Sequence, residues 1–200
     1  MAVIKHKEQR VGIFIDAQNL YHSAKNLYQR KVNFGAVLEE VLADRTLIRA
    51  IAYVITSDSG EESSFFDALL KQGIETKTKD LQVFSGGAKK ADWDVGLAVD
   101  AIKMSAKLDT VIIISGDGDF VPLVEYLKMN GCQVEAGSFG RSSSHKLVEV
   151  ADDFIDFDLD LEKFLIKESK RPSQRTSSRQ GSQTSSRSKT RPTQKTTHKK

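Results

Sequence analysis

The sequence is organised around the apolar run Thr110-Val-Ile-Ile-Ile114 and the Ser115-Gly-Asp-Gly-Asp-Phe120 that follows it. The run shows no alternation of polar and apolar residues, which is typical of a central strand covered on both faces of a sheet. Asp117 and Asp119 come just after it. In an open α/β sheet, ligands bind beyond the carboxyl ends of the strands, near the point where the strand order reverses. The segment therefore predicts a buried strand with an acidic site at its end.

Apolar runs alternate with amphipathic segments on both sides of this strand. Further strands are expected at residues 11–15, 47–55, 74–84 (one strand or two) and 132–138, and helices at 17–28, 34–44, 61–72, 92–107 and 120–129. Such alternation predicts an α/β fold, in which a mostly parallel sheet of five or six strands carries helices on both faces. Asn33 is placed to cap the second helix. The apolar face of the 92–107 helix is expected to contain Val95, Val99, Ile102 and Ala106.

Charge divides the chain into two parts. Residues 169–200 contain ten Lys and Arg and no Asp or Glu, whereas residues 1–168 contain 20 Lys and Arg against 27 Asp and Glu, a net charge of −7. The basic segment has no aliphatic or aromatic residue with which to offset its ordering entropy. We therefore expect a folded domain over residues 10–160 and a disordered tail over residues 167–200. The tail suits a polyanion such as RNA, and the simpler alternative is that it aids solubility.

Several classes of protein are excluded by composition. The longest apolar run, residues 50–55, is far short of the roughly 20 residues that span a bilayer, so no membrane is expected. No apolar signal segment is visible near the N-terminus, and Cys132 is the single cysteine, which removes internal disulfides and cysteine metal sites. A cytoplasmic location is expected. Oligomeric state is left open.

Carboxylates recur at the expected ligand-binding edge. Asp16 ends the first strand, Asp117 and Asp119 follow the 110–114 strand, and Asp94 lies at the start of a helix. If the two strands are neighbours, these acids meet and repel one another, so the cluster needs raised pKa values or a bound cation. Oxygen ligands favour Mg²⁺ or Mn²⁺. Such an ion lowers the pKa of a bound water and stabilises charge on a phosphodiester under attack.

Each acid also has a plain structural explanation. Asp16 could cap the first helix, and Asp94 could complement a helix N-terminus. Asp117 and Asp119 lie between glycines that let the backbone turn tightly, and this is a common turn composition. The occurrence of all four at one predicted edge favours a site over four separate coincidences.

Three segments carry a family resemblance: Phe14-Ile-Asp-Ala-Gln-Asn19, Lys90-Ala-Asp-Trp-Asp-Val95 with Asp100 beyond it, and Ser115-Gly-Asp-Gly-Asp-Phe-Val-Pro-Leu123. Together they resemble the motifs of the NYN domain family, which belongs to the PIN-like nucleases, and they are most similar to the LabA-like (DUF88) branch. The resemblance runs from about residue 11 to residue 157. It implies a PIN-like Rossmannoid fold and divalent-metal-dependent cleavage of RNA, expected to be single-stranded.

The resemblance also implies roles for individual residues. Asp16, Asp94, Asp117 and Asp119 resemble the catalytic, metal-binding acids, and Asn19 and Ser115 resemble the polar residues that support them. Many PIN-like nucleases place another acid after the first strand. Glu39 and Glu40 lie in that region, but neither matches a family position, which leaves a second metal site open.

Weaker candidates surround this set. Asp92 and Asp100 could support the site, although a solvated helix face is as good an explanation for Asp100. Lys89 and Lys90 could contact an RNA phosphate, or belong to an ordinary exposed loop. Trp93 and Tyr21 could stack on a base, although aromatic residues at helix starts more often pack. The three histidines nearest these motifs have no partner at catalytic spacing.

Two functions from different classes remain. The first is a metal-dependent ribonuclease that leaves a 5′-phosphate product. The second is a non-catalytic RNA-binding or regulatory module whose acids are structural or bind metal without turnover. Haloacid-dehalogenase-like phosphatases would have Asp where Gln18 stands, and toprim-type nucleases would have Glu where Asp16 stands. Both are weaker alternatives.

Overall fold

The computed structural model describes residues 3–56, 63–80, 82–83, 89–90 and 93–167. Asp92 and nearly all of the expected basic tail lie outside these residues. Lys89 and Lys90 are described only as backbone. Within the described ranges, no helix is both long enough and apolar enough to cross a lipid bilayer.

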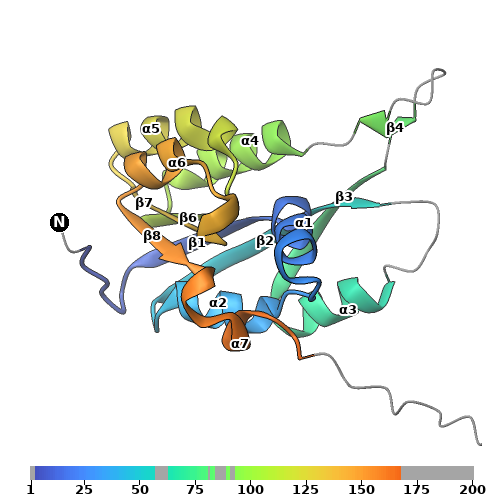
Figure 1. Ribbon diagram of the computed structural model, residues 1–200. Coiled ribbons are helices and arrows are strands. Elements are labelled where there is room, and N and C mark those ends of the chain that lie inside the picture. Colours follow the sequence, from blue (N-terminus) through green and yellow to red (C-terminus); the bar gives the residue numbers. More distant parts are fainter. Residues whose placement is uncertain (1–2, 57–62, 81, 84–88, 91–92, 168–200) are drawn as a thin grey trace, which may run out of the picture. The chain divides into compact units, whose positions relative to one another are not determined.

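Six parallel strands form the main sheet (Figure 1). From one edge to the other they are β3 (Ile74–Asp80), β2 (Thr46–Thr56), β1 (Arg10–Asp16), β6 (Thr110–Ile114), β7 (Gln133–Ser138) and β8 (Asp153–Asp156). A separate antiparallel pair joins β4 (Gln82–Val83) to β5 (Lys89–Lys90). The predicted α/β class is confirmed. The run at 74–84 is divided between β3 and β4, and β8 is a strand that the sequence patterns did not predict.

The order of the strands reverses between β1 and β6. β1 pairs in parallel with β2 on one side and with β6 on the other, and Ile15 lies opposite Ile114. The next residues along the two strands, Asp16 and Ser115, therefore emerge side by side at the carboxyl edge. All five residues of β6 are buried, as expected for a central strand. The switch point of the sheet thus coincides with the acidic motifs.

Helices cover both faces of the sheet (Figure 1). One core lies under α1 (Ala17–Tyr28), α2 (Phe34–Leu42), α3 (Ser63–Lys71) and α7 (Leu161–Phe164). The other lies under α4 (Asp94–Ser105), α5 (Val121–Met129) and α6 (His145–Val150). Short 3₁₀ turns follow three of the strands: η1 (Gly118–Phe120), η2 (Gly140–Ser142) and η3 (Phe157–Asp160).

The predicted apolar face of α4 is wrong. Val95 is 75% exposed, and Val99 and Ile102 are 39% and 38% exposed, whereas the helix buries Leu97 and Ala101. Both stripes are apolar, so hydrophobic spacing alone could not say which one meets the sheet. Leu97 and Ala101 belong to one buried cluster with Phe14 of β1, and this packing against the sheet decides which stripe is buried. The cap prediction at Asn33 is confirmed, because its Oδ1 accepts a hydrogen bond from the Ala36 N–H at 3.3 Å.

A buried ion pair ties α2 and β2 to β7. Arg45 and Glu135 are joined by two hydrogen bonds, of 2.5 and 2.9 Å, and both side chains are fully shielded from solvent. The Arg45–Glu135 pair was not foreseen, because its partners are 90 residues apart in the sequence.

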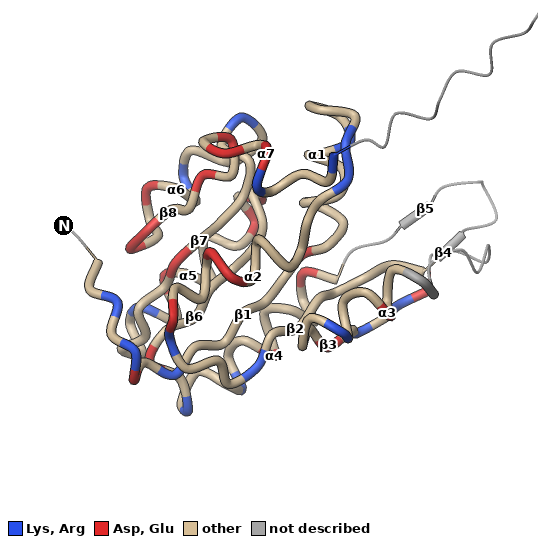
Figure 2. The backbone as a smooth tube through the Cα atoms, turned by 90° about the horizontal axis from the view of Figure 1, so that it is seen from below, with Lys and Arg blue, Asp and Glu red and all other residues tan. Residues whose placement is uncertain are grey.

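A separate group of acidic residues lies around β8, at one edge of the sheet, and around α7 (Figure 2).

Candidate active site

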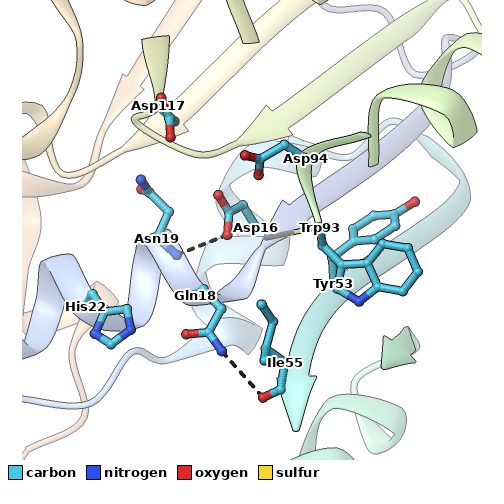
Figure 3. Close-up of a pocket in the computed structure, with 9 residues that line it drawn as sticks. All are labelled: Asp16, Gln18, Asn19, His22, Tyr53, Ile55, Trp93, Asp94 and Asp117. Atoms are coloured by element: carbon cyan, nitrogen blue, oxygen red, sulfur yellow. Dashed lines mark hydrogen bonds between the residues drawn. The ribbon is translucent and has the colours of Figure 1, made fainter. Parts of the chain in front are cut away.

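A cavity of about 200 Å³ opens at the switch point of the sheet (Figure 3). It lies beyond the ends of β1 and β2, between the first turns of α1 and α4 and the turn that follows β6. Its lining consists of Asp16, Gln18, Asn19, His22, Tyr53, Ile55, Trp93, Asp94 and Asp117. We refer to it below as the acidic cavity.

Three carboxylates face this cavity from three separate elements. Asp16 ends β1, Asp94 is the first residue of α4, and Asp117 precedes η1 (Figure 3). Asp119 is not among the lining residues: its side chain is exposed, and its backbone N–H donates to Asp117 Oδ1 at 2.9 Å. Asp117 therefore caps the turn that carries Asp119. The structure brings together three of the four acids named from the sequence.

Asp16 serves as both a helix cap and a cavity residue. Its Oδ1 accepts a hydrogen bond from the Asn19 N–H at 3.0 Å, and its Oδ2 accepts one from Ser115 Oγ at 3.1 Å. Burial raises the pKa of this carboxyl, and the negative charge of Asp117 raises it further, although the hydrogen bonds to the Asn19 backbone and Ser115 act in the opposite direction. The structural and functional explanations of Asp16 are thus compatible.

Two polar residues connect the turn after β6 to its surroundings. The buried Ser115 accepts a hydrogen bond at Oγ from the Asp117 N–H at 3.2 Å while it donates to Asp16. Asn19 Oδ1 accepts one from the Gly116 N–H at 3.0 Å. These contacts fix the Asp117 backbone relative to the first turn of α1.

The glycines of this turn are needed for a reason that the sequence did not indicate. Neither Gly116 nor Gly118 has a positive φ, so no left-handed turn requires them. A Cβ at Gly116 would instead lie 3.0 Å from Ser142 O and from Ser143 Cα, and one at Gly118 would lie 2.8 Å from Ser144 Oγ. The glycines allow the loop after η2 to pack directly against the acidic turn.

An aromatic pair forms one wall of the cavity. The rings of Tyr53 and Trp93 meet edge to face with centroids 5.8 Å apart. A Cβ at Gly96 would lie only 2.1 Å from the indole, so Gly96 provides the space that Trp93 occupies. Trp93 therefore packs against Tyr53, which agrees with the packing role expected as the alternative to base stacking. This contact lies at the edge of the cavity.

Asp100 lies behind this wall rather than in the cavity. Its Oδ2 accepts hydrogen bonds from Tyr53 Oη at 2.7 Å and from Lys77 Nζ at 2.5 Å. Burial would raise the pKa of Asp100, but the hydrogen bonds from Lys77 and Tyr53 outweigh it and hold the pKa below its ordinary value. Burial and the contact with Asp100 together raise the pKa of Tyr53 strongly, so this phenol stays protonated. Asp100 thus orients Tyr53.

Gln18 was not named as a site residue from the sequence, and His22 was set aside because it has no partner at catalytic spacing, yet both line the cavity. Both lie with Asn19 on the face of α1 that turns toward the cavity, and their spacing of four residues is the signal that could have found them. Glu39 and Glu40 do not line the cavity: they are exposed on α2, where Glu40 pairs with Lys163.

The oxygen atoms that line the acidic cavity are of the kind that bind a hard divalent cation. Carboxylate oxygens from three elements and the Asn19 amide surround a small cavity, and a cation there would offset the cost of burying the charge of Asp16. Across the described ranges, however, no three His, Cys, Asp or Glu side chains are grouped closely enough to form a ready metal site.

The fold and this site define a doubly wound α/β protein with an acidic pocket at its switch point. The NYN domain matches residues 10–162, and the chain belongs to the NYN domain family. This family is generally one of nucleases that act on RNA. The matched range, residues 10–162, includes every element from β1 to η3.

Three relatives resemble the chain over most of its length. It is 28% identical over 177 residues to the low amplitude and bright protein LabA of Synechococcus elongatus, with 83% of the chain and 92% of LabA covered. It is also 28% identical to an uncharacterized protein of Methanocaldococcus jannaschii, covering 82% of the chain and 63% of that protein. A crystal structure of a Vibrio parahaemolyticus protein of unknown function superimposes with a TM-score of 0.73 at 29% identity, covering 82% of the chain and all of that protein.

Proposed function

We propose that the protein is a divalent-metal-dependent ribonuclease that hydrolyses phosphodiesters of single-stranded RNA at the acidic cavity. The observation that carries the proposal is the arrangement of Asp16, Asp94 and Asp117, which reach one cavity from three separate elements at the switch point of the sheet. Family membership supports the same chemistry.

These carboxylates would hold Mg²⁺ or Mn²⁺. The ion would lower the pKa of a water and stabilise the charge that develops on the phosphodiester during in-line attack. Asn19 and Ser115 keep the carboxylates in place through the hydrogen bonds described above. The wall of Tyr53 and Trp93 limits access of bulk water from one side. Asp119, which is exposed next to Asp117, is proposed only as a charge near the site.

Contacts with the RNA outside the cavity are part of the same proposal. Lys89 and Lys90 would contact its phosphates, and the basic segment 169–200 would hold the strand close by charge. Asp92, which lies outside the described residues, is kept in the proposal only as a supporting acid.

A non-catalytic RNA-binding module is the second candidate. It is favoured by two observations: no ready three-ligand metal group is found in the described part of the chain, and neither Glu39 nor Glu40 lies at the cavity. In this alternative the acids of the cavity serve the fold or bind a cation without turnover.

The deciding experiment is cleavage of 5′-end-labelled single-stranded RNA with Mn²⁺, Mg²⁺ or EDTA. Wild type should cleave only with a metal, and Asp117→Asn should not cleave at all. Asp67→Asn, which changes an exposed acid on α3, is the matched control and should cleave like wild type. Binding of the RNA without metal-dependent cleavage by wild type would establish the non-catalytic alternative.

A further inference from the structure

A second, larger cavity adjoins the acidic one. It has a volume of about 480 Å³ and lies over the end of β2, between α1, α2 and α3. Gln18 and Ile55 line both cavities, and a hydrogen bond of 3.4 Å from Gln18 Nε2 to the Ile55 carbonyl joins the two residues (Figure 3). The two spaces are therefore separated by one pair of residues.

The walls of the second cavity are mainly apolar and partly aromatic. Phe34 and Phe65 meet edge to face with ring centroids 5.5 Å apart, and Leu69 is buried beside them. Tyr21 lines the cavity with 42% of its surface exposed. Such walls suit a flat apolar ring.

Polar groups lie at particular points of this lining. The Gln72 amide packs over Gly35, where an added Cβ would approach its Cδ and Nε2 to 3.2 Å. An amide offers both a donor and an acceptor to the edge of a heterocycle. Lys31 also lines the cavity, and Lys25 Nζ lies 5.5 Å from the centre of the Tyr21 ring. Cationic groups beside an aromatic pocket are complementary to a nucleotide, in which the base is joined through the sugar to a phosphate.

From these features we infer that the second cavity binds one nucleobase of an RNA strand whose phosphate lies at the acidic cavity. The inference rests on the proposed function for the position of that phosphate. The volume lies within the roughly 300–1,000 Å³ of small-ligand sites. A strand that crosses the wall of Gln18 and Ile55 places a base in one cavity while its backbone passes the other.

Filling the cavity tests this inference. Ala68 lines it from α3, and Ala68→Phe should occupy the space of the base. Leu70→Phe is the matched control, because Leu70 is 69% exposed on the same helix and does not line the cavity. Binding of fluorescent single-stranded RNA to the full chain is measured in EDTA, where cleavage does not interfere. Ala68→Phe should weaken binding by about tenfold, the scale expected for loss of one stacked base, and Leu70→Phe should leave it unchanged.

RNA with a single abasic nucleotide, moved stepwise along the strand, provides the second measurement. Wild type should bind one of these RNAs distinctly more weakly, and Ala68→Phe should lose that dependence on position. Tyr21→Ala, on another wall, should act in the same direction if Ala68→Phe does not fold, as judged by circular dichroism. Equal binding of all abasic RNAs by wild type would overturn the inference. So would unchanged RNA binding with a lowered melting temperature in Ala68→Phe, which would assign the cavity to the protein's own packing.

The base site and the nuclease fail in different ways. A position-dependent abasic effect without Mn²⁺-dependent cleavage would keep the base site and reject the ribonuclease. Metal-dependent cleavage without any effect of the abasic position would keep the ribonuclease and reject the base site.

Discussion

Asn19 Oδ1 accepts a hydrogen bond from the backbone N–H of Gly116, at 3.0 Å, and this contact joins the first turn of α1 to the turn that follows β6. The two residues are 97 positions apart in the sequence. Because the Asn19 N–H also donates to Asp16, one residue holds the carboxylate that ends β1 and the backbone that leads to Asp117.

Asn19→Ala should lower both stability and activity. It leaves the Gly116 N–H without its partner, which costs about 1–3 kcal/mol if the group stays buried. Cleavage should fall because Asp117 loses its fixed backbone position. Urea unfolding and single-turnover cleavage measure the two effects. Wild-type turnover in a destabilised Asn19→Ala would show that the contact serves the fold alone.

Asp117→Asn and Asp119→Asn should differ in their effects on cleavage. Asp117 faces the acidic cavity, whereas Asp119 is exposed and outside its lining. We expect Asp117→Asn to abolish metal-dependent cleavage with the fold intact, since Asn keeps the side-chain oxygen that caps η1. Asp119→Asn should retain most of the activity. Equal losses in the two variants, measured on end-labelled RNA, would place Asp119 in the catalytic set.

Gly96→Ala should move the wall of the cavity. The new methyl group would lie 2.1 Å from the Trp93 ring, so the indole must shift even though Ala is favoured over Gly in a helix by about 1 kcal/mol. Trp93 is the only tryptophan, so intrinsic fluorescence reports this movement directly. We expect altered emission and greater access of a quencher. Val99→Ala, at an exposed position of the same helix, should leave the spectrum unchanged.

Glu135→Gln should strongly destabilise the protein. It removes the negative charge opposite Arg45 while both side chains remain fully buried, and breaking such a pair costs about 3–5 kcal/mol. Glu75→Gln is the control, because its contact with Arg49 is half exposed and such pairs contribute about 0–1 kcal/mol. Urea unfolding of both variants gives the comparison. Similar losses would mean that the buried pair contributes no more than the exposed one.

The pair of Arg10 and Asp109 should give stability that depends on pH. Hydrogen bonds from the Arg10 side chain and backbone lower the pKa of Asp109 from 3.8 to about 2. A carboxyl whose pKa is lower in the folded state stabilises the fold above its unfolded pKa, and this stabilisation is lost as the pH falls through the folded pKa. Wild type should therefore exceed Asp109→Asn in stability at pH 5, by a margin that shrinks between about pH 4 and pH 2. The margin should be small because the pair is largely exposed. A margin that does not change with pH would assign the effect to another contact.

Apolar runs and helix-capping residues in the sequence were sufficient to predict the class of the fold and most of its strands and helices. The unbroken apolar run at 110–114 predicted the buried central strand, and Asn33 predicted the start of α2, because both signals depend only on local chemistry. The short β8 was not predicted, since its segment 153–156 is half-buried and holds only two apolar residues between two aspartates, a composition typical of a polar loop. The exposed stripe of α4 was misassigned because two apolar stripes on one helix are equivalent until a neighbour packs against one of them.

The sequence alone was sufficient to identify the acidic motifs, since Asp16 and Asp117 each follow an apolar run. Their meeting was decided by the tertiary structure, through the pairing of β1 with β6 and the hydrogen bonds of Ser115 and Asn19. Asp119 is two residues from Asp117 and equivalent to it by composition, yet the short turn of η1 leaves it exposed. Tyr53 entered the site only through packing, because β2 is distant in the chain from the acidic motifs. Local interactions specify which residues end a strand or begin a helix, whereas the surroundings of a side chain depend on contacts across the sheet that no short segment contains.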